Sequence, residues 1–99
     1  MNPSKIEIKG DTLIAIGEIG YEQAGEFARL CDTFLAGHKS HPATIDLSKV
    51  EELVSPCLTA VYDDARLHRP GELKIIAPQR LAHLFEPGET EGLFSLEAL

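Results

Sequence analysis

The spacing of apolar residues divides the chain into alternating strands and helices. Apolar and polar positions alternate in residues 6–9, and residues 13–16 form a short apolar run rich in β-branched side chains. Gly10-Asp11 separates these segments, which predicts two strands joined in a β-hairpin. Two more short apolar runs, at residues 43–47 and 73–77, predict strands that each follow a helix.

Apolar residues at helical spacing predict two longer helices. The first spans residues 21–36, with an apolar stripe formed by Ala24, Phe27, Ala28, Cys31, Phe34 and Leu35. The second begins at Ser55-Pro56, where the serine is expected to cap the helix, and Pro70-Gly71 ends it. Its buried residues are predicted to be Leu58, Val61, Tyr62 and Ala65. Its exposed residues are predicted to be Asp63, Asp64, Arg66 and Arg69.

The remaining segments complete an alternating order. Residues 48–54 are predicted to be a loop, a third short helix runs from Pro78 to Pro87-Gly88, and a last short strand or turn occupies residues 93–96. Strands separated by helices favour parallel neighbours with helices packed on the sheet. We therefore expect one α/β domain over residues 1–99, with a small mixed sheet of four to five strands and helices mainly on one face.

The charge of the chain narrows the classes of partner. Its 99 residues carry a formal net charge of −7. This balance disfavours nucleic-acid binding, which needs a basic face, and also disfavours an anionic membrane surface. No apolar stretch approaches the roughly 20 residues of a membrane span, and the N-terminus shows no signal peptide. We therefore expect a cytosolic protein without direct membrane insertion.

Four segments in order resemble those of STAS domains, the module shared by bacterial anti-sigma-factor antagonists and the tails of anion transporters. Gly-Glu-Ile at residues 17–19 resembles the Gly-x-Leu segment of the family, and Asp-Leu-Ser-Lys-Val at 46–50 resembles its Asp-Leu-Ser-Gly-Val stretch. Leu-Val-Ser-Pro-Cys-Leu at 53–58 stands in the place of Ile-Asp-Ser-Ser-Gly-Leu. Residues 73–94 resemble the closing strand, helix and Leu-Phe ending. The resemblance implies a STAS-like fold and a non-enzymatic regulatory module.

The third segment also departs from the antagonist pattern. Antagonists controlled by partner switching are phosphorylated on a serine at this helix start, usually the second of a Ser pair. That position is Pro56 here, so Ser55 is the hydroxyl that remains. The small STAS subunits of lipid-asymmetry ABC transporters carry Asp-Thr-Ala-Gly at this place, which also has one hydroxyl residue. The partner implied is thus an anti-sigma factor with serine kinase character or, alternatively, an ABC ATPase.

Both forms of the resemblance direct attention to the start of the second long helix. The residues that we expect to contact the partner are Ser55, Pro56, Thr59, Asp63 and Arg66. Ser55 is also the possible phosphorylation site, because a phosphate is favoured at a helix N-terminus. The resemblance makes Asp46 a supporting acid for that site; otherwise Asp46 ties down the loop that follows it.

An enzymatic alternative, a small hydrolase using Ser55 or Cys57, lacks a recognisable motif. No Gly-x-Ser-x-Gly elbow or Gly-rich phosphate loop is present. Cys57 falls in a first helical turn, where backbone amides can lower the pKa of a thiol, but a packed small residue is the simpler reading. To bind a metal, the histidines would need to converge with a carboxylate. Histidines in a loop are more often simply exposed to solvent, so we expect neither a metal nor a cofactor.

Overall fold

The computed structural model describes residues 4–99, which form five strands and four helices. Along the chain the elements are β1 (Lys5–Lys9), β2 (Thr12–Ile19), α1 (Tyr21–Ala36), β3 (Pro42–Leu53), α2 (Ser55–His68), β4 (Glu72–Ala77), α3 (Gln79–Ala82), α4 (Glu86–Thr90) and β5 (Ser95–Ala98). The order agrees with the predicted alternation apart from α4. In this described part of the chain, no helix has the length and apolar character needed to cross a bilayer.

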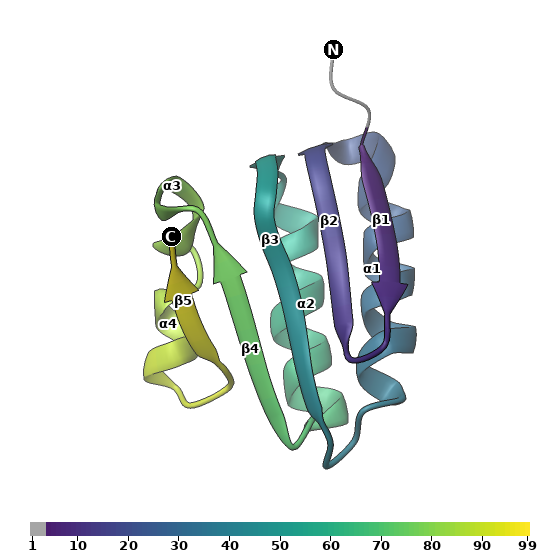
Figure 1. The fold of residues 1–99 in the computed structure, drawn as a ribbon, viewed down its shortest axis with the longest axis vertical. Helices are drawn as coiled ribbons and strands as arrows, with labels where there is room; N and C mark the ends of the chain where they lie inside the picture. The colour runs from purple at the N-terminus through teal and green to yellow at the C-terminus, as the bar shows by residue number, and fades with distance from the viewer. Residues whose placement is uncertain (1–3) are drawn as a thin grey trace.

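The five strands form one sheet in the order β1-β2-β3-β4-β5. β1 and β2 pair antiparallel across a turn at Gly10, whose φ of 58° suits glycine, so the predicted hairpin is confirmed. The other three strand pairs are parallel, and a helix or a pair of helices connects each. Figure 1 shows α1 and α2 behind the sheet and α3 and α4 at its β4–β5 edge. The mixed α/β architecture is therefore confirmed.

The hydrophobic core lies between the sheet and the helices. Alternate residues of β2 and β3, such as Leu13, Ile45 and Leu47, are fully buried under α1 and α2. Their neighbours in sequence, such as Ile14 and Asp46, are only partly buried and point to the uncovered face. The buried residues of α1 are Ala24, Phe27, Cys31, Phe34 and Leu35, which confirms the predicted stripe except for the partly buried Ala28.

β3 is longer than the strand predicted at residues 43–47, because it continues to Leu53. Its pairing with β2 shifts register twice, which places extra β3 residues against β2 without ending the strand. At the first shift the backbone N–H of Ser48 donates to Oδ1 of Asp46 at 2.9 Å. The prediction of a loop over 48–54 is therefore wrong, since most of that polar segment is a bulged strand.

The chain after β4 also differs from the predicted single helix. α3 stops at Ala82, a turn follows, and Pro87 and Gly88 lie inside α4 instead of ending a helix. A Cβ atom at Gly88 would overlap the ring of Phe94, so glycine allows α4 and the start of β5 to approach closely. β5 then pairs parallel with β4, which confirms a last strand slightly later than predicted.

Asp64 is 9% exposed, whereas the sequence pattern predicts it on the solvent side of α2. That prediction is wrong because α2 packs against α1 as well as against the sheet, so its buried side is wider than one stripe. Burial raises the pKa of the Asp64 carboxyl above its ordinary value, and a hydrogen bond from the Cys31 thiol partly opposes this shift. Asp63, Arg66 and Arg69 are exposed, as predicted.

Tyr62 fastens α2 to the α3–α4 segment. Its hydroxyl donates to the carbonyl oxygen of Leu84 at 3.0 Å and accepts the backbone N–H of Gly88 at 3.1 Å. The Tyr62 ring also lies edge-on to Phe94, with 5.6 Å between the centroids, and stacks on Phe85 at 6.5 Å. One side chain therefore fixes where α2 lies relative to the C-terminal third of the chain.

We expect Tyr62→Phe to lower the free energy of unfolding by about 1–3 kcal/mol, because the ring is kept while two backbone groups lose their partner. Urea denaturation measures this change. Tyr21→Phe is the matched control, since Tyr21 is 74% exposed and its loss of a hydroxyl should leave stability nearly unchanged. Equal effects of the two substitutions would show that the Tyr62 hydroxyl does not hold α2 in place.

Candidate functional site

The start of α2 is placed by the end of β3. β3 ends at Leu53, and the backbone N–H of Val54 donates to the carbonyl oxygen of Ile19 at 3.1 Å, which ties this short connection to the end of β2. Ser55 then begins α2 and Pro56 occupies its second position, where a fixed φ and a missing N–H suit a first turn. Ser55 therefore lies at the carboxyl edge of the parallel strands, the upper edge in Figure 1.

The hydroxyl of Ser55 does not cap the helix. Val54 is the N-cap residue, Ser55 is the first helical residue, and no side chain bonds to the free amides. The expectation that Ser55 caps α2 is thus wrong, because the helix begins one residue earlier than a serine cap at this position requires. Within residues 4–99 the Ser55 hydroxyl has no hydrogen-bond partner, and the residue is exposed. The hydroxyl is available to another molecule.

The predicted contact residues share the solvent side of α2. Ser55, Thr59 and Asp63 recur every four residues, so they form one stripe along the helix. All five predicted contact residues are exposed, namely Ser55, Pro56, Thr59, Asp63 and Arg66. The opposite side of α2 carries Cys57, Val61 and Ala65, all buried. The helix thus presents a continuous polar surface that starts at Ser55.

Arg66 is not free at the far end of this stripe. Its guanidinium lies 3.1 Å from Oε2 of Glu91 and 3.9 Å from Oδ1 of Asp63, and it also lies over the ring of Tyr62 at 5.5 Å. These contacts join α2 to the end of α4. Exposed ion pairs contribute little stability, so a partner that offers a carboxylate would compete with Glu91 at modest cost.

Asp46 and Ser55 are not brought together. Asp46 lies in the middle of β3, seven residues before Leu53, which corresponds to about 20 Å along a strand. Its side chain points to the uncovered face of the sheet and accepts the N–H of Ser48. Of the two roles expected from the sequence, the geometry therefore supports the local backbone contact.

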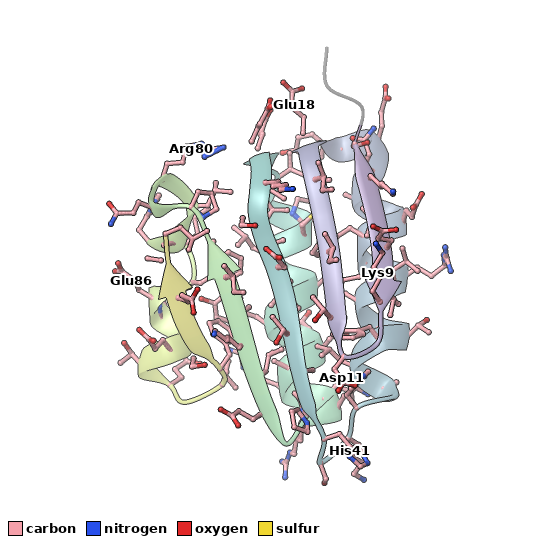
Figure 2. All side chains as sticks on the ribbon, in the orientation of Figure 1. Lys9, Asp11, Glu18, His41, Arg80 and Glu86 are labelled. Carbon is pink, nitrogen blue, oxygen red and sulfur yellow. The ribbon has the colours of Figure 1, made fainter. Side chains whose placement is uncertain are left out.

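The edge around Ser55 is acidic. Glu18 and Glu52 are paired across β2 and β3, and both are exposed near the ends of these strands. Arg80 reaches the same edge from α3 and donates to the carbonyl oxygen of Val50 at 2.7 Å; Figure 2 labels Glu18 and Arg80 there. The first turn of α2 itself holds no acidic residue, so the carboxylates at this edge come from the ends of β2 and β3.

Both cysteines are fully buried. Burial raises the pKa of the Cys57 thiol to about 11, so the first-turn position does not lower it as the reactive alternative requires. Burial together with the charge of Asp64 also raises the pKa of the Cys31 thiol. The reading of Cys31 and Cys57 as packed small residues is therefore the correct one.

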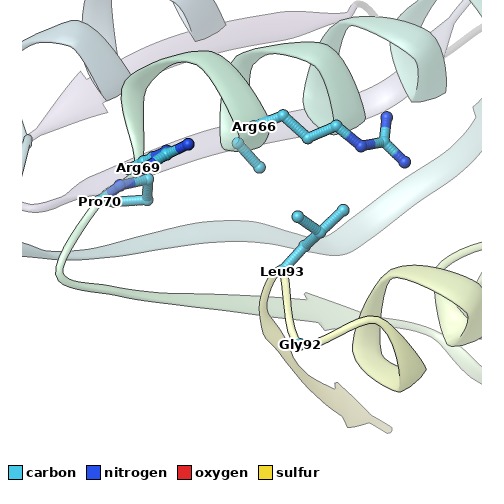
Figure 3. A pocket seen from close by; sticks show the side chains of 6 residues that line it. Arg66, Arg69, Pro70, Gly92 and Leu93 are labelled. Atoms are coloured by element: carbon cyan, nitrogen blue, oxygen red, sulfur yellow. The ribbon is translucent and has the colours of Figure 1, made fainter.

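A pocket of about 430 Å³ lies at the other end of α2, away from Ser55 (Figure 3). Its lining residues are Ala65, Arg66, Arg69, Pro70, Gly92 and Leu93. The two arginines would attract an anion, but the C-terminal end of α2 carries the negative end of the helix dipole. The guanidinium of Arg66 is also already paired with the carboxylate of Glu91. The charges around this pocket oppose one another, so they do not favour a ligand of either sign.

The architecture defines a small α/β class with helices on one face of the sheet, and solved structures of that class match it. An anti-sigma factor antagonist from Mycobacterium paratuberculosis superimposes with a TM-score of 0.70 at 18% identity, over 96% of this chain and 84% of that one. A protein with a SpoIIAA-like fold from Shewanella loihica PV-4 gives 0.57 at 17%, over 98% and 84%. Unphosphorylated SpoIIAA, an anti-sigma factor antagonist, gives 0.57 at 9%, over 98% and 87%.

No family model matches the sequence. No curated protein gives a significant sequence match either. The structural likenesses establish the fold: this chain has the SpoIIAA-like fold, which confirms the STAS-like architecture that the four sequence segments imply.

We expect a thiol-reactive reagent to leave both cysteines of the folded protein unmodified at pH 7. With a pKa of about 11, roughly one Cys57 thiol in ten thousand is ionised at that pH, and burial blocks access. Absorbance after addition of an aromatic disulfide reagent measures the reaction. Ser55→Cys is the positive control, because it places a thiol at the exposed start of α2. Fast modification of Cys57 in the folded protein would restore the enzymatic alternative.

Proposed function

We propose that this protein is a non-enzymatic regulatory module that acts by binding another protein through the start of α2. The binding surface is the exposed stripe of Ser55, Thr59 and Asp63, extended by Pro56 and Arg66. We also propose that the whole chain acts as one domain in the cytosol. The observation that carries the proposal is the Ser55 hydroxyl, which is exposed at the carboxyl edge of the parallel strands and has no hydrogen-bond partner among residues 4–99.

The nature of the surface supports binding over catalysis. A nucleophilic serine needs an adjacent base, and within residues 4–99 no hydrogen bond joins Ser55 to a histidine. Loops and helix starts at the carboxyl edge of parallel strands are where open α/β folds meet their ligands. A helix end with an exposed hydroxyl and nearby charges can form hydrogen bonds and ion pairs with another protein.

The partner that we favour is an anti-sigma factor with serine kinase character. Two of the matching structures are described as anti-sigma factor antagonists, and the sequence segments resemble the same group. Phosphorylation of Ser55 would add about −1.5 to −2 charges to an edge that already carries Glu18 and Glu52. Pro56 removes one N–H from the helix end, so fewer backbone amides of α2 are available to a phosphate there. The added charge would therefore weaken an interface formed here.

A second candidate partner is the ATPase subunit of an ABC-type lipid transporter. The observation in its favour is that a single hydroxyl residue is followed by Pro56, which matches the one-hydroxyl arrangement of the small transporter subunits. In this role Ser55 is a contact residue and not a phosphorylation site. Genes for an ATPase and a permease beside this one would favour the transporter role, whereas a neighbouring kinase and phosphatase would favour the anti-sigma role.

We expect Ser55→Asp to raise the Kd for an anti-sigma kinase partner about thirtyfold or more, which corresponds to about 2 kcal/mol for an unpaired charge at an interface. Ser55→Ala should bind nearly as well as the unmodified chain. Binding of the purified kinase encoded in the same genome, measured by calorimetry, gives both values.

Ser95→Asp is the matched control for that measurement. Ser95 is also exposed but begins β5, near the other end of the sheet, so the same charge there should leave Kd unchanged. If Ser55→Asp and Ser95→Asp bind equally well, the start of α2 is not the interface. If Ser55→Ala loses binding as strongly as Ser55→Asp, the hydroxyl is a contact and the added charge is not the switch.

A further inference from the structure

Three potential metal ligands converge at the seam between α1 and α2, away from the Ser55 edge. Asp32 comes from α1, and Asp64 and His68 stand one turn apart on α2, so both of the latter face α1. One ligand atom from each of the three lies within 4.8 Å of the others. Nε2 of His68 and Oδ1 of Asp32 are 2.6 Å apart. The surface binding described above uses none of these side chains.

This cluster differs from a chance group of surface acids in two respects. The first is its mixed set of ligand atoms, since an imidazole nitrogen and two carboxylate oxygens lie close together. The second is the state of Asp64, a carboxylate that is nine-tenths buried. Its hydrogen bond comes from the Cys31 thiol, a weak donor, and His68 attracts it electrostatically, although the close ion pair of His68 is with Asp32. A buried carboxylate so weakly compensated is a group that a cation would stabilise.

We propose that Asp32, Asp64 and His68 bind a divalent transition-metal ion, and that Zn²⁺ matches the site. One histidine and two carboxylates are a ligand set that Zn²⁺ accepts, with water as the fourth ligand of a tetrahedron. Mg²⁺ and Ca²⁺ prefer oxygen ligands alone, so they fit less well. The ion would offset the repulsion between two carboxylates and join α1 to α2 at the end of the helices opposite Ser55.

The geometry needs a small adjustment to hold the ion. Ligand atoms of a tetrahedral zinc site are about 3.3 Å apart, given metal–ligand distances near 2.0–2.2 Å. The His68 nitrogen and the Asp32 oxygen must therefore separate slightly from 2.6 Å, and Asp64 must approach. Asp32 has 57% of its side chain exposed, so it can rotate and leaves an entry path. The thiol of Cys31 keeps its hydrogen bond to Asp64 and orients that carboxylate.

Titration of the metal-free protein with zinc chloride tests the site. We expect one Zn²⁺ per chain by calorimetry and a melting temperature that rises with zinc concentration, because a ligand of the folded state stabilises it. Asp64→Asn and His68→Ala should each weaken binding by about tenfold or more, since loss of a ligand costs at least as much as loss of its outer support. Magnesium chloride should give neither effect.

His38→Ala is the matched control. His38 also pairs with an aspartate, with Nε2 3.0 Å from Oδ1 of Asp11, but no second carboxylate joins that pair. The control should bind zinc like the unmodified chain. The proposal fails if zinc at millimolar concentration neither binds saturably nor raises the melting temperature. It also fails if Asp64→Asn, folded by circular dichroism, keeps full affinity, or if His38→Ala loses as much affinity as His68→Ala.

Discussion

The central position of β3 is the constraint on which the rest of the structure depends. β3 pairs in parallel with β2 on one side and with β4 on the other, and β5 adds in the same direction. Parallel neighbours require crossover connections, and crossovers are right-handed. Because each new strand is added on the same side of the last, every crossover falls on the same face. This rule explains the one uncovered face and brings the starts of α1, α2 and α3 to one edge.

Most of that arrangement follows from local patterns in the sequence. The apolar stripe of α1 recurs at helical spacing, and Gly10 marks the hairpin turn, so neither depends on distant contacts. Pro56 signals the start of α2 in the same way. The five exposed residues proposed for partner binding were also predictable, because a solvent stripe is the complement of an apolar one. The position of the start of α2 at the carboxyl edge of the sheet could be predicted from the order of strands and helices alone.

The remaining features depend on tertiary contacts that local patterns do not carry. Residues 48–52 extend β3 because β2 is long enough to pair with them, although four of the five are polar. Asp64 is buried because α2 meets α1, and an aspartate on a helix is otherwise assigned to solvent. The convergence of Asp32 with Asp64 and His68 joins two helices through packing, so no spacing along the chain reveals it.

The two ends of α2 differ in a way that bears on how a signal at Ser55 would act. Toward its C-terminal end the helix is held chiefly by Tyr62 through two hydrogen bonds. The pairs of Arg66 with Glu91 and of His68 with Asp32 contact the neighbouring helices as well. A helix fixed in this way loses little conformational freedom on binding, which favours affinity. At its opposite end, the Ser55 side chain has no hydrogen bond within residues 4–99 that an added charge would break. Such a charge would therefore regulate binding by altering the surface itself rather than by changing the fold.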